Sequence, residues 1–170
     1  MTWATDDLFV AGGDYVSASW TEFQAQAGVS AVITVSDAGP VAYLAPLPWA
    51  ALWLSVADEA AYTLDQLGLG VAFIDAALAA GHKVLLHGPA GLHRTRPLVA
   101  AHLLAQGRSL ARVLRDLEAK PWLPPYKGSR DLLAAWTAHL AGADGQASRG
   151  TIGSKAHGVG DSRDSGPPLG

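Results

Sequence analysis

The stretch Val84-Leu85-Leu86-His87-Gly88-Pro89-Ala90-Gly91-Leu92-His93-Arg94-Thr95 indicates both the fold and the candidate site. An apolar run leads directly into a glycine-containing loop, and the residues after the loop favour a helix. A loop between a strand and a helix directs several backbone N–H groups to one point, which suits a phosphate or sulfate. Arg94 can add a bidentate contact to two phosphate oxygens. The sequence therefore predicts a phosphate-binding loop at residues 88–94.

The segments around this loop predict an alternation of strands and helices. Strands are expected at residues 8–10, 31–36, 52–56 and 83–87. Helices are expected from Ser19 to about Gly28, at 62–80, at 95–105, from Ser109 through Leu117 and at 131–140. This alternation indicates an α/β fold with a central, mainly parallel twisted sheet flanked by helices. Ligands of such sheets bind beyond the carboxyl ends of strands, where both Asp58 and the 88–94 loop fall.

Composition excludes several kinds of function. Of the 170 residues, 49% are hydrophobic and none is cysteine, so disulfides, thiolate metal sites and a cysteine nucleophile are all excluded within this sequence. The net charge of -3 gives no support for binding to nucleic acid. His82, His87 and His93 lack a spacing that places metal ligands on one face. We expect no metal and no cofactor, and the sequence predicts no oligomeric state.

The ends of the chain differ in composition from its centre. Residues 1–7 contain acidic residues and no apolar run, so no signal peptide is expected there. No stretch approaches the roughly 20 apolar residues of a membrane span, and we expect a cytoplasmic protein without membrane contact. Residues 1–142 are expected to form one domain. Residues 143–170 are rich in Gly, Ser, Asp and Arg, and we expect a disordered tail or, alternatively, a peptide that docks on a partner.

The same stretch resembles the signature of the dual-specificity and tyrosine phosphatase superfamily. That signature reads His-Cys, two residues, Gly, two residues, Arg, then Ser or Thr. Every fixed element is present except the cysteine, which Gly88 replaces. Residues 8–13, the helix that ends at Gly28 and the strand at 31–36 resemble the opening of a compact dual-specificity phosphatase. Residues 107–113 resemble the helical hairpin that follows the family's loop, so the resemblance covers roughly residues 7–140.

The resemblance implies roles for individual residues. Asp58 stands 30 residues before Gly88, in the place of the family's general acid, and the adjacent Glu59 is an alternative. His87 is expected to support the loop through a hydrogen bond. Thr95 would ease departure of the thiolate in the family, and here it is expected to cap the helix or bond to the loop. His93 occupies a variable position and is a candidate ligand contact. The phosphate-binding set comprises Gly88, Pro89, Ala90, Gly91, Leu92, His93 and Arg94.

Gly88 changes the expected chemistry. In the family, the cysteine thiolate attacks phosphorus and forms a phosphoenzyme, and a glycine has no side chain that could attack. Glycine still permits binding, because it removes a negative charge and leaves the loop amides and Arg94 in place. The chain thus resembles pseudophosphatases, which are thought to bind phosphorylated partners without turnover. The expected function is binding of a phosphorylated protein or a small phosphoester.

Several alternatives to this function remain open. An active phosphomonoester hydrolase would use water above Gly88 with help from Asp58 or His93. Gly88 could also be an engineered replacement of an active cysteine. A scaffold domain without a ligand would have the same fold. A nucleotide-binding P-loop fits poorly, because His93 and Arg94 stand where that motif requires Gly and Lys.

Overall fold

The structure is a computed structural model that describes residues 1–88, 92–120 and 126–150, without the side chains of Asp14 and residues 144–150. The strands are β1 (Thr2–Trp3), β2 (Leu8–Gly12), β3 (Val29–Val35), β4 (Ala50–Leu54) and β5 (Lys83–Gly88). The α-helices are α1 (Trp20–Ala27), α2 (Leu64–Ala79), α3 (Arg96–Ala105), α4 (Leu110–Glu118) and α5 (Arg130–Gly150), with short 3-10 helices η1 (Asp14–Val16) and η2 (His93–Thr95).

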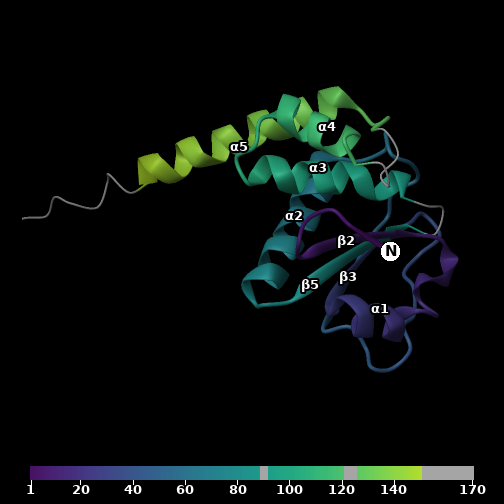
Figure 1. Cartoon of the computed structure of the whole chain (residues 1–170). Helices are drawn as coiled ribbons and strands as arrows, with labels where there is room; N and C mark the ends of the chain where they lie inside the picture. Colours follow the sequence, from purple (N-terminus) through teal and green to yellow (C-terminus); the bar gives the residue numbers. More distant parts are fainter. Residues whose placement is uncertain (89–91, 121–125, 151–170) are drawn as a thin grey trace, which may run out of the picture.

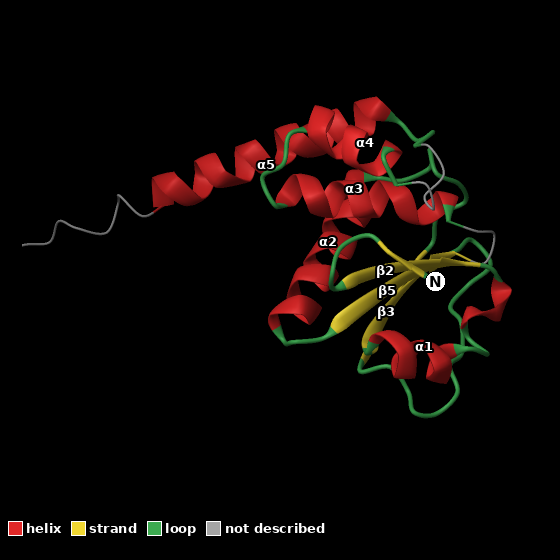
Figure 2. Ribbon diagram, in the orientation of Figure 1, coloured by secondary structure: helices red, strands yellow, loops and turns green. Residues whose placement is uncertain are grey.

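The strands form one sheet in the order β1-β2-β5-β3-β4. β1 is antiparallel to β2, and the other neighbours are parallel. Helix α1 covers one face of the sheet, and α2, α3, α4 and α5 lie on the other side (Figures 1 and 2). The predicted α/β fold with a mainly parallel sheet flanked by helices is therefore confirmed. The last strand in sequence, β5, occupies the centre of the sheet.

Alternating side chains of the strands build a separate apolar core on each face of the sheet. On the side of α1, Leu85 packs with Trp20 and Phe23. On the opposite side, Val84 and Leu86 join the larger core formed with the remaining helices. The sheet is thus apolar on both faces, as expected for parallel strands covered by helices. This arrangement fixes the carboxyl end of β5, where the loop begins.

The helix boundaries follow local capping. Thr63 and Gln66 form a reciprocal capping box, so α2 begins at Leu64 and the expected helical residue Tyr62 lies before it. Helix α1 ends at Gly28, whose φ of 70° lies in the left-handed region that glycine adopts readily. Ser19 occupies the N-cap position of α1, but its side chain makes no capping hydrogen bond. Ser109 does cap α4, by accepting from Arg112 N.

Helices α2 and α3 approach closely at Gly70. A Cβ atom at this position would lie 2.5 Å from Leu98 Cδ1, so only glycine fits without a shift of the fully buried Leu98. Helix α5 completes the layer through Trp136, whose indole N–H donates to the Ala101 carbonyl at 3.0 Å. A Cβ atom at Gly68 would meet Trp136 only at an ordinary distance of 3.7 Å.

Helix α5 extends past the expected domain boundary. The predicted helix at 131–140 lies within it, and the helix continues to Gly150, whereas the tail was expected to begin at residue 143. The remainder of that tail, residues 151–170, lies outside the described residues. Within the described ranges, no helix is both long enough and apolar enough to cross a membrane.

Candidate phosphate-binding site

Gly88 ends the central strand and is buried. It pairs with Gly12 of β2, and its carbonyl accepts a hydrogen bond from Gly13 N at 3.0 Å. Pro89, Ala90 and Gly91 of the expected phosphate-binding set lie outside the described residues. From Leu92 onward the structure is described again. Here the chain forms η2 and continues directly into α3. The strand and the helix that flank the expected phosphate loop are therefore both in place.

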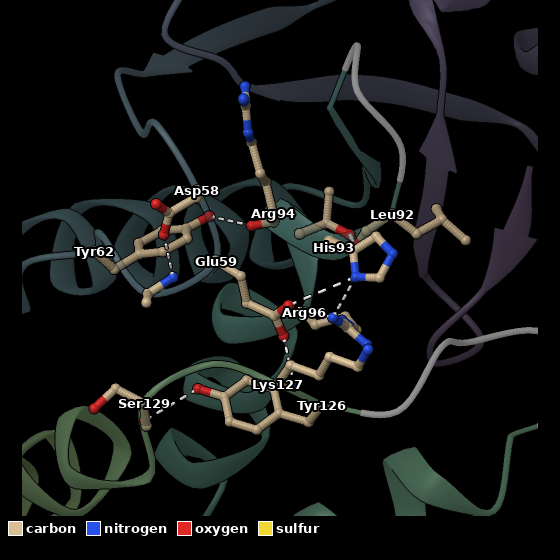
Figure 3. A network of polar contacts seen from close by, with 12 residues as sticks. Asp58, Glu59, Tyr62, Leu92, His93, Arg94, Arg96, Tyr126, Lys127 and Ser129 are labelled. Carbon is tan, nitrogen blue, oxygen red and sulfur yellow. Dashed lines mark hydrogen bonds and ion pairs between the residues drawn. The ribbon is translucent and has the colours of Figure 1, made fainter.

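Arg94 is positioned by two contacts from distant segments. Its Nη1 donates to Asp37 Oδ1 at 2.8 Å, which links η2 to the loop after β3. Its carbonyl accepts from the Tyr62 hydroxyl at 2.6 Å (Figure 3). Burial raises the pKa of the Tyr62 hydroxyl above its usual range, so this group remains a donor. Figure 3 shows the side chain of Arg94 extending away from Glu59 and Arg96.

His87 lies in a buried triangle of polar groups. Its Nε2 is 2.6 Å from the Tyr43 hydroxyl and 2.9 Å from Thr34 Oγ1, and these two oxygens are 3.0 Å apart. Burial lowers the pKa of His87 to about 4. Its Nδ1 is buried without a hydrogen-bond partner among the described residues. These contacts of His87 link β5 to β3 and to the loop that carries Tyr43.

Thr95 bonds within the segment that follows the loop. Its fully buried hydroxyl donates to the Leu92 carbonyl at 2.8 Å. Thr95 also occupies the N-cap position of α3, but its side chain makes no capping hydrogen bond. Of the two expected roles, the structure gives Thr95 the bond to the loop segment and not the cap.

Asp58 and Glu59 are neighbours in the sequence, but their side chains have different surroundings. The Asp58 carboxylate is exposed and accepts from Ala60 N at 2.7 Å. Glu59 instead faces inward, and Figure 3 shows it between His93, Arg96 and Lys127. Its side chain is 11% exposed and forms an ion pair with Arg96, which is 1% exposed. The acidic group that reaches the segment after the loop is thus Glu59.

The Glu59 cluster, formed by Glu59, His93, Arg96 and the backbone of Lys127, joins four parts of the chain. Besides Arg96, Glu59 Oε1 accepts from Lys127 N at 2.9 Å, and Arg96 Nη2 lies 2.6 Å from His93 Nδ1. Tyr126 lies beside this cluster, and burial together with the Glu59 charge raises its pKa to about 12. The cluster ties the segment after β4 to η2, to the start of α3 and to the segment before α5.

Sequence reasoning missed several of these residues. Arg96, Tyr43, Thr34, Asp37 and Tyr62 were not in the predicted site. One signal was present, because Arg96 is a charged residue directly before the apolar run at residues 97–101, and a buried arginine requires a partner. In the described part of the chain, no group of three or more His, Cys, Asp or Glu side chains could hold a metal ion.

The chain is an α/β domain with a central sheet flanked by helices, and this fold matches those of dual-specificity phosphatases. Among solved structures, human DUSP28 is similar to this chain, with 27% sequence identity and a TM-score of 0.69 over 84% of this chain and 99% of that chain. The human tyrosine phosphatase-like serine/threonine/tyrosine-interacting protein has 18% identity and a TM-score of 0.64, over 84% of this chain and 94% of that chain. PTPMT1 in complex with PI(5)P has 18% identity and a TM-score of 0.65, over 85% of this chain and 97% of that chain.

The similarity to DUSP28 supports the superfamily resemblance, whereas the two structures at 18% identity show the fold alone. Comparison with protein-family models and with curated protein sequences gives no match.

Proposed function

We propose that this chain binds phosphomonoesters in the loop at residues 88–94 without turning them over efficiently. One observation carries the proposal: Gly88 ends the central strand where the resembled signature has its nucleophile, while Arg94 is held at the start of the next helix. The phosphatase-like fold supports a phosphate ligand. The absence of cysteine from the 170 residues removes the thiolate route.

Arg94 keeps N–H donors that can bind a phosphate. A guanidinium has five N–H donors in a planar fork, and Asp37 accepts from Nη1 of Arg94. The hydrogen bond from Tyr62 to the Arg94 carbonyl orders the backbone of this residue. Because the side chain is 18% exposed, a ligand can reach the guanidinium without unfolding the segment. Positive charge and N–H donors therefore remain where the resembled family binds phosphate.

The hydroxyl of Thr95 and the carboxylate of Asp58, the general-acid candidate, are both engaged in contacts with the backbone. The Thr95 hydroxyl is fully buried and donates to the Leu92 carbonyl. Asp58 is exposed, and its carboxylate bonds to the backbone of its own turn. A hydroxyl is a weak nucleophile unless an adjacent base, a lowered pKa or a metal ion activates it. These contacts support binding over turnover.

The proposed ligands are phosphorylated proteins or small phosphoesters. One similar structure contains PI(5)P, and another is of a protein named as serine/threonine/tyrosine-interacting, so lipid and protein phosphates are both suitable probes. The loop at residues 37–48 borders the site through Asp37 and Tyr43. We propose that this loop sets the depth of the binding site and thereby selects the ligand.

The experiment compares wild-type protein with the Gly88→Cys and Arg94→Ala variants. Calorimetric titration uses inorganic phosphate, phosphotyrosine and phosphoserine peptides, and turnover is measured with p-nitrophenyl phosphate. Position 88 lies in a strand, so its backbone accepts cysteine. We expect the wild type to bind without turnover, Gly88→Cys to hydrolyse the aryl phosphate, and Arg94→Ala to lose binding. Arg112→Ala is the matched control, because Arg112 is 69% exposed on the remote helix α4.

Two results would reject the proposal. Wild-type turnover that disappears in Arg94→Ala would identify an active hydrolase. A folded wild-type protein that binds none of the three ligands would identify a scaffold domain.

A further inference from the structure

We propose that two copies of this chain associate through β4, with the two strands antiparallel and a two-fold axis at Leu52. The two sheets then join into one continuous sheet. This interface uses a surface that has no part in the proposed function, so it stands whether or not the loop at residues 88–94 binds phosphate.

Strand β4 has an open edge. It is the last strand of the sheet, and β3 is its only neighbour among the strands that the structure describes. Leu54 directs its carbonyl to β3, where the oxygen accepts from Ser36 N at 3.1 Å. Because the backbone groups of successive residues in a strand point to opposite sides, Ala51 and Trp53 direct their N–H and C=O groups to the open edge. Such an edge is a template for pairing with another strand.

The neighbouring parts of the sheet edges are protected. The Ser55 carbonyl accepts from the Gln66 side chain at 2.8 Å, so it is not available to another strand. At the opposite end of the sheet, β1 spans only Thr2–Trp3, and two aspartates lie between it and β2. Short edge strands and nearby charges both hinder strand pairing. Strand β4 has neither protection.

The segment around β4 carries no charge that would oppose a second copy. Residues 38–57 contain no Asp, Glu, Lys, Arg or His. The same segment holds large apolar side chains that are between 41% and 68% exposed, namely Leu44, Leu47, Trp49 and Trp53. A two-fold interface brings one surface against a copy of itself, so a charged surface would repel its partner. A neutral apolar surface is complementary to its own copy.

The sequence of β4 also matches itself in side-chain size. A two-fold axis at Leu52 places Ala51 opposite Trp53 of the second copy, on one face of the sheet. On the other face, it places Ala50 opposite Leu54 of the second copy. Each bulky side chain therefore meets a small one. In this register, Ala51 and Trp53 are also the residues that exchange N–H···O bonds between the copies.

Trp53 is arranged for this contact before association. Its indole N–H donates to the Ser36 carbonyl at 2.8 Å, yet 41% of the residue stays exposed. A side chain that is already fixed loses less conformational entropy when two surfaces meet. Tryptophan is also among the residues that contribute most to the stability of protein interfaces. We therefore expect Trp53 to be the main apolar contact.

The first test measures the mass of the full-length protein in solution. Sedimentation velocity from micromolar to millimolar concentration should show a dimer that dissociates on dilution. Ala51→Lys adds a charge to the open edge of each copy, and it should raise the Kd of the dimer at least about tenfold. Ala111→Lys is the matched control, because Ala111 is exposed on the remote helix α4. Since Ala51 is exposed as well, both variants should keep the far-UV circular dichroism of the wild type.

Two results of this test would overturn the proposal. One is a wild-type protein that stays monomeric at millimolar concentration. The other is a folded Ala51→Lys protein that forms a dimer as tight as that of the wild type.

The second test detects the register, and it uses the absence of cysteine from the 170 residues. At the two-fold axis, Leu52 faces its copy as a non-hydrogen-bonded pair with Cα atoms about 4.5 Å apart, which a disulfide can span. Leu52→Cys should therefore form a reducible covalent dimer on oxidation, whereas Ala111→Cys should stay unlinked under the same conditions. A Leu52→Cys dimer that stays unlinked would overturn the pairing about Leu52. This test remains decisive if Ala51→Lys fails to fold.

Discussion

Arg94 Nη1 donates to Asp37 Oδ1 at 2.8 Å, although the two residues are 57 positions apart in the sequence. The carboxylate thus occupies one edge of the guanidinium that we expect to bind phosphate. An anionic side chain at this place competes with an anionic ligand.

Asp37→Asn should therefore strengthen phosphate binding. Asparagine keeps an oxygen acceptor for Arg94 but removes the negative charge that competes with the ligand and repels it. Since Asp37 is 56% exposed, solvent screens its charge, and we expect a modest two- to fivefold decrease in Kd for inorganic phosphate. Asp116→Asn is the control, because Asp116 pairs with Arg108 and Arg112 on the remote α4 side. Weaker binding by Asp37→Asn would show that Asp37 instead positions Arg94.

The sequence predicted the strand, the position of Gly88 and the start of the following helix, because each depends on neighbouring residues. It did not predict the partner of Arg94 or the inward direction of Glu59. Asp58 and Glu59 are adjacent carboxylates, and the resemblance favoured Asp58. The turn after β4 directs Asp58 outward and Glu59 toward Arg96. Contacts between distant segments depend on the packing of the whole sheet, which hydrophobic periodicity does not encode.

Glu59→Gln should destabilise the protein strongly. Arg96 is 1% exposed and would keep its charge after Glu59 loses its own, and breaking a buried ion pair costs about 3–5 kcal/mol. Urea denaturation measures the free energy of unfolding. The adjacent Asp58→Asn is the control, since its exposed side chain keeps an acceptor for Ala60 N, and its effect should stay within about 0.5 kcal/mol. Equal changes in the free energy of unfolding would contradict a buried ion pair between Glu59 and Arg96.

His87 should make the protein less stable in acid. Its pKa is lowered from 6.5 to about 4 in the folded state, so the unfolded state binds the proton more readily. Stability is unaffected by this group above pH 6.5, falls between pH 6.5 and about 4, and then levels off. The expected loss is at most about 3 kcal/mol.

Urea denaturation at pH 7 and near pH 4 should therefore show a smaller loss of stability in His87→Gln than in the wild type. The other titrating groups affect both proteins alike. An identical pH dependence of the two proteins would refute a buried neutral His87.

Gly70→Ala and Gly68→Ala should differ in sign, although both lie in α2. A methyl group at position 70 would meet the buried Leu98 at 2.5 Å, so we expect a net loss of about 1 kcal/mol or more from overpacking. At position 68 the nearest atom is 3.7 Å away, and alanine should stabilise the helix by up to about 1 kcal/mol. Chemical denaturation of both variants measures the difference. Stabilisation by both alanines would show that α2 and α3 are less closely packed.

The central place of β5 in the sheet has a consequence for synthesis on the ribosome. β2 and β3 emerge first, yet each bonds to β5 and neither bonds to the other. The nascent chain must therefore leave room between two unpaired strand edges until residues 83–88 appear. During this interval the unpaired strand edges can form hydrogen bonds with strands of other chains. The strand that carries Gly88 thus also completes the sheet during synthesis, and substitutions in it can alter the yield of folded protein independently of ligand affinity.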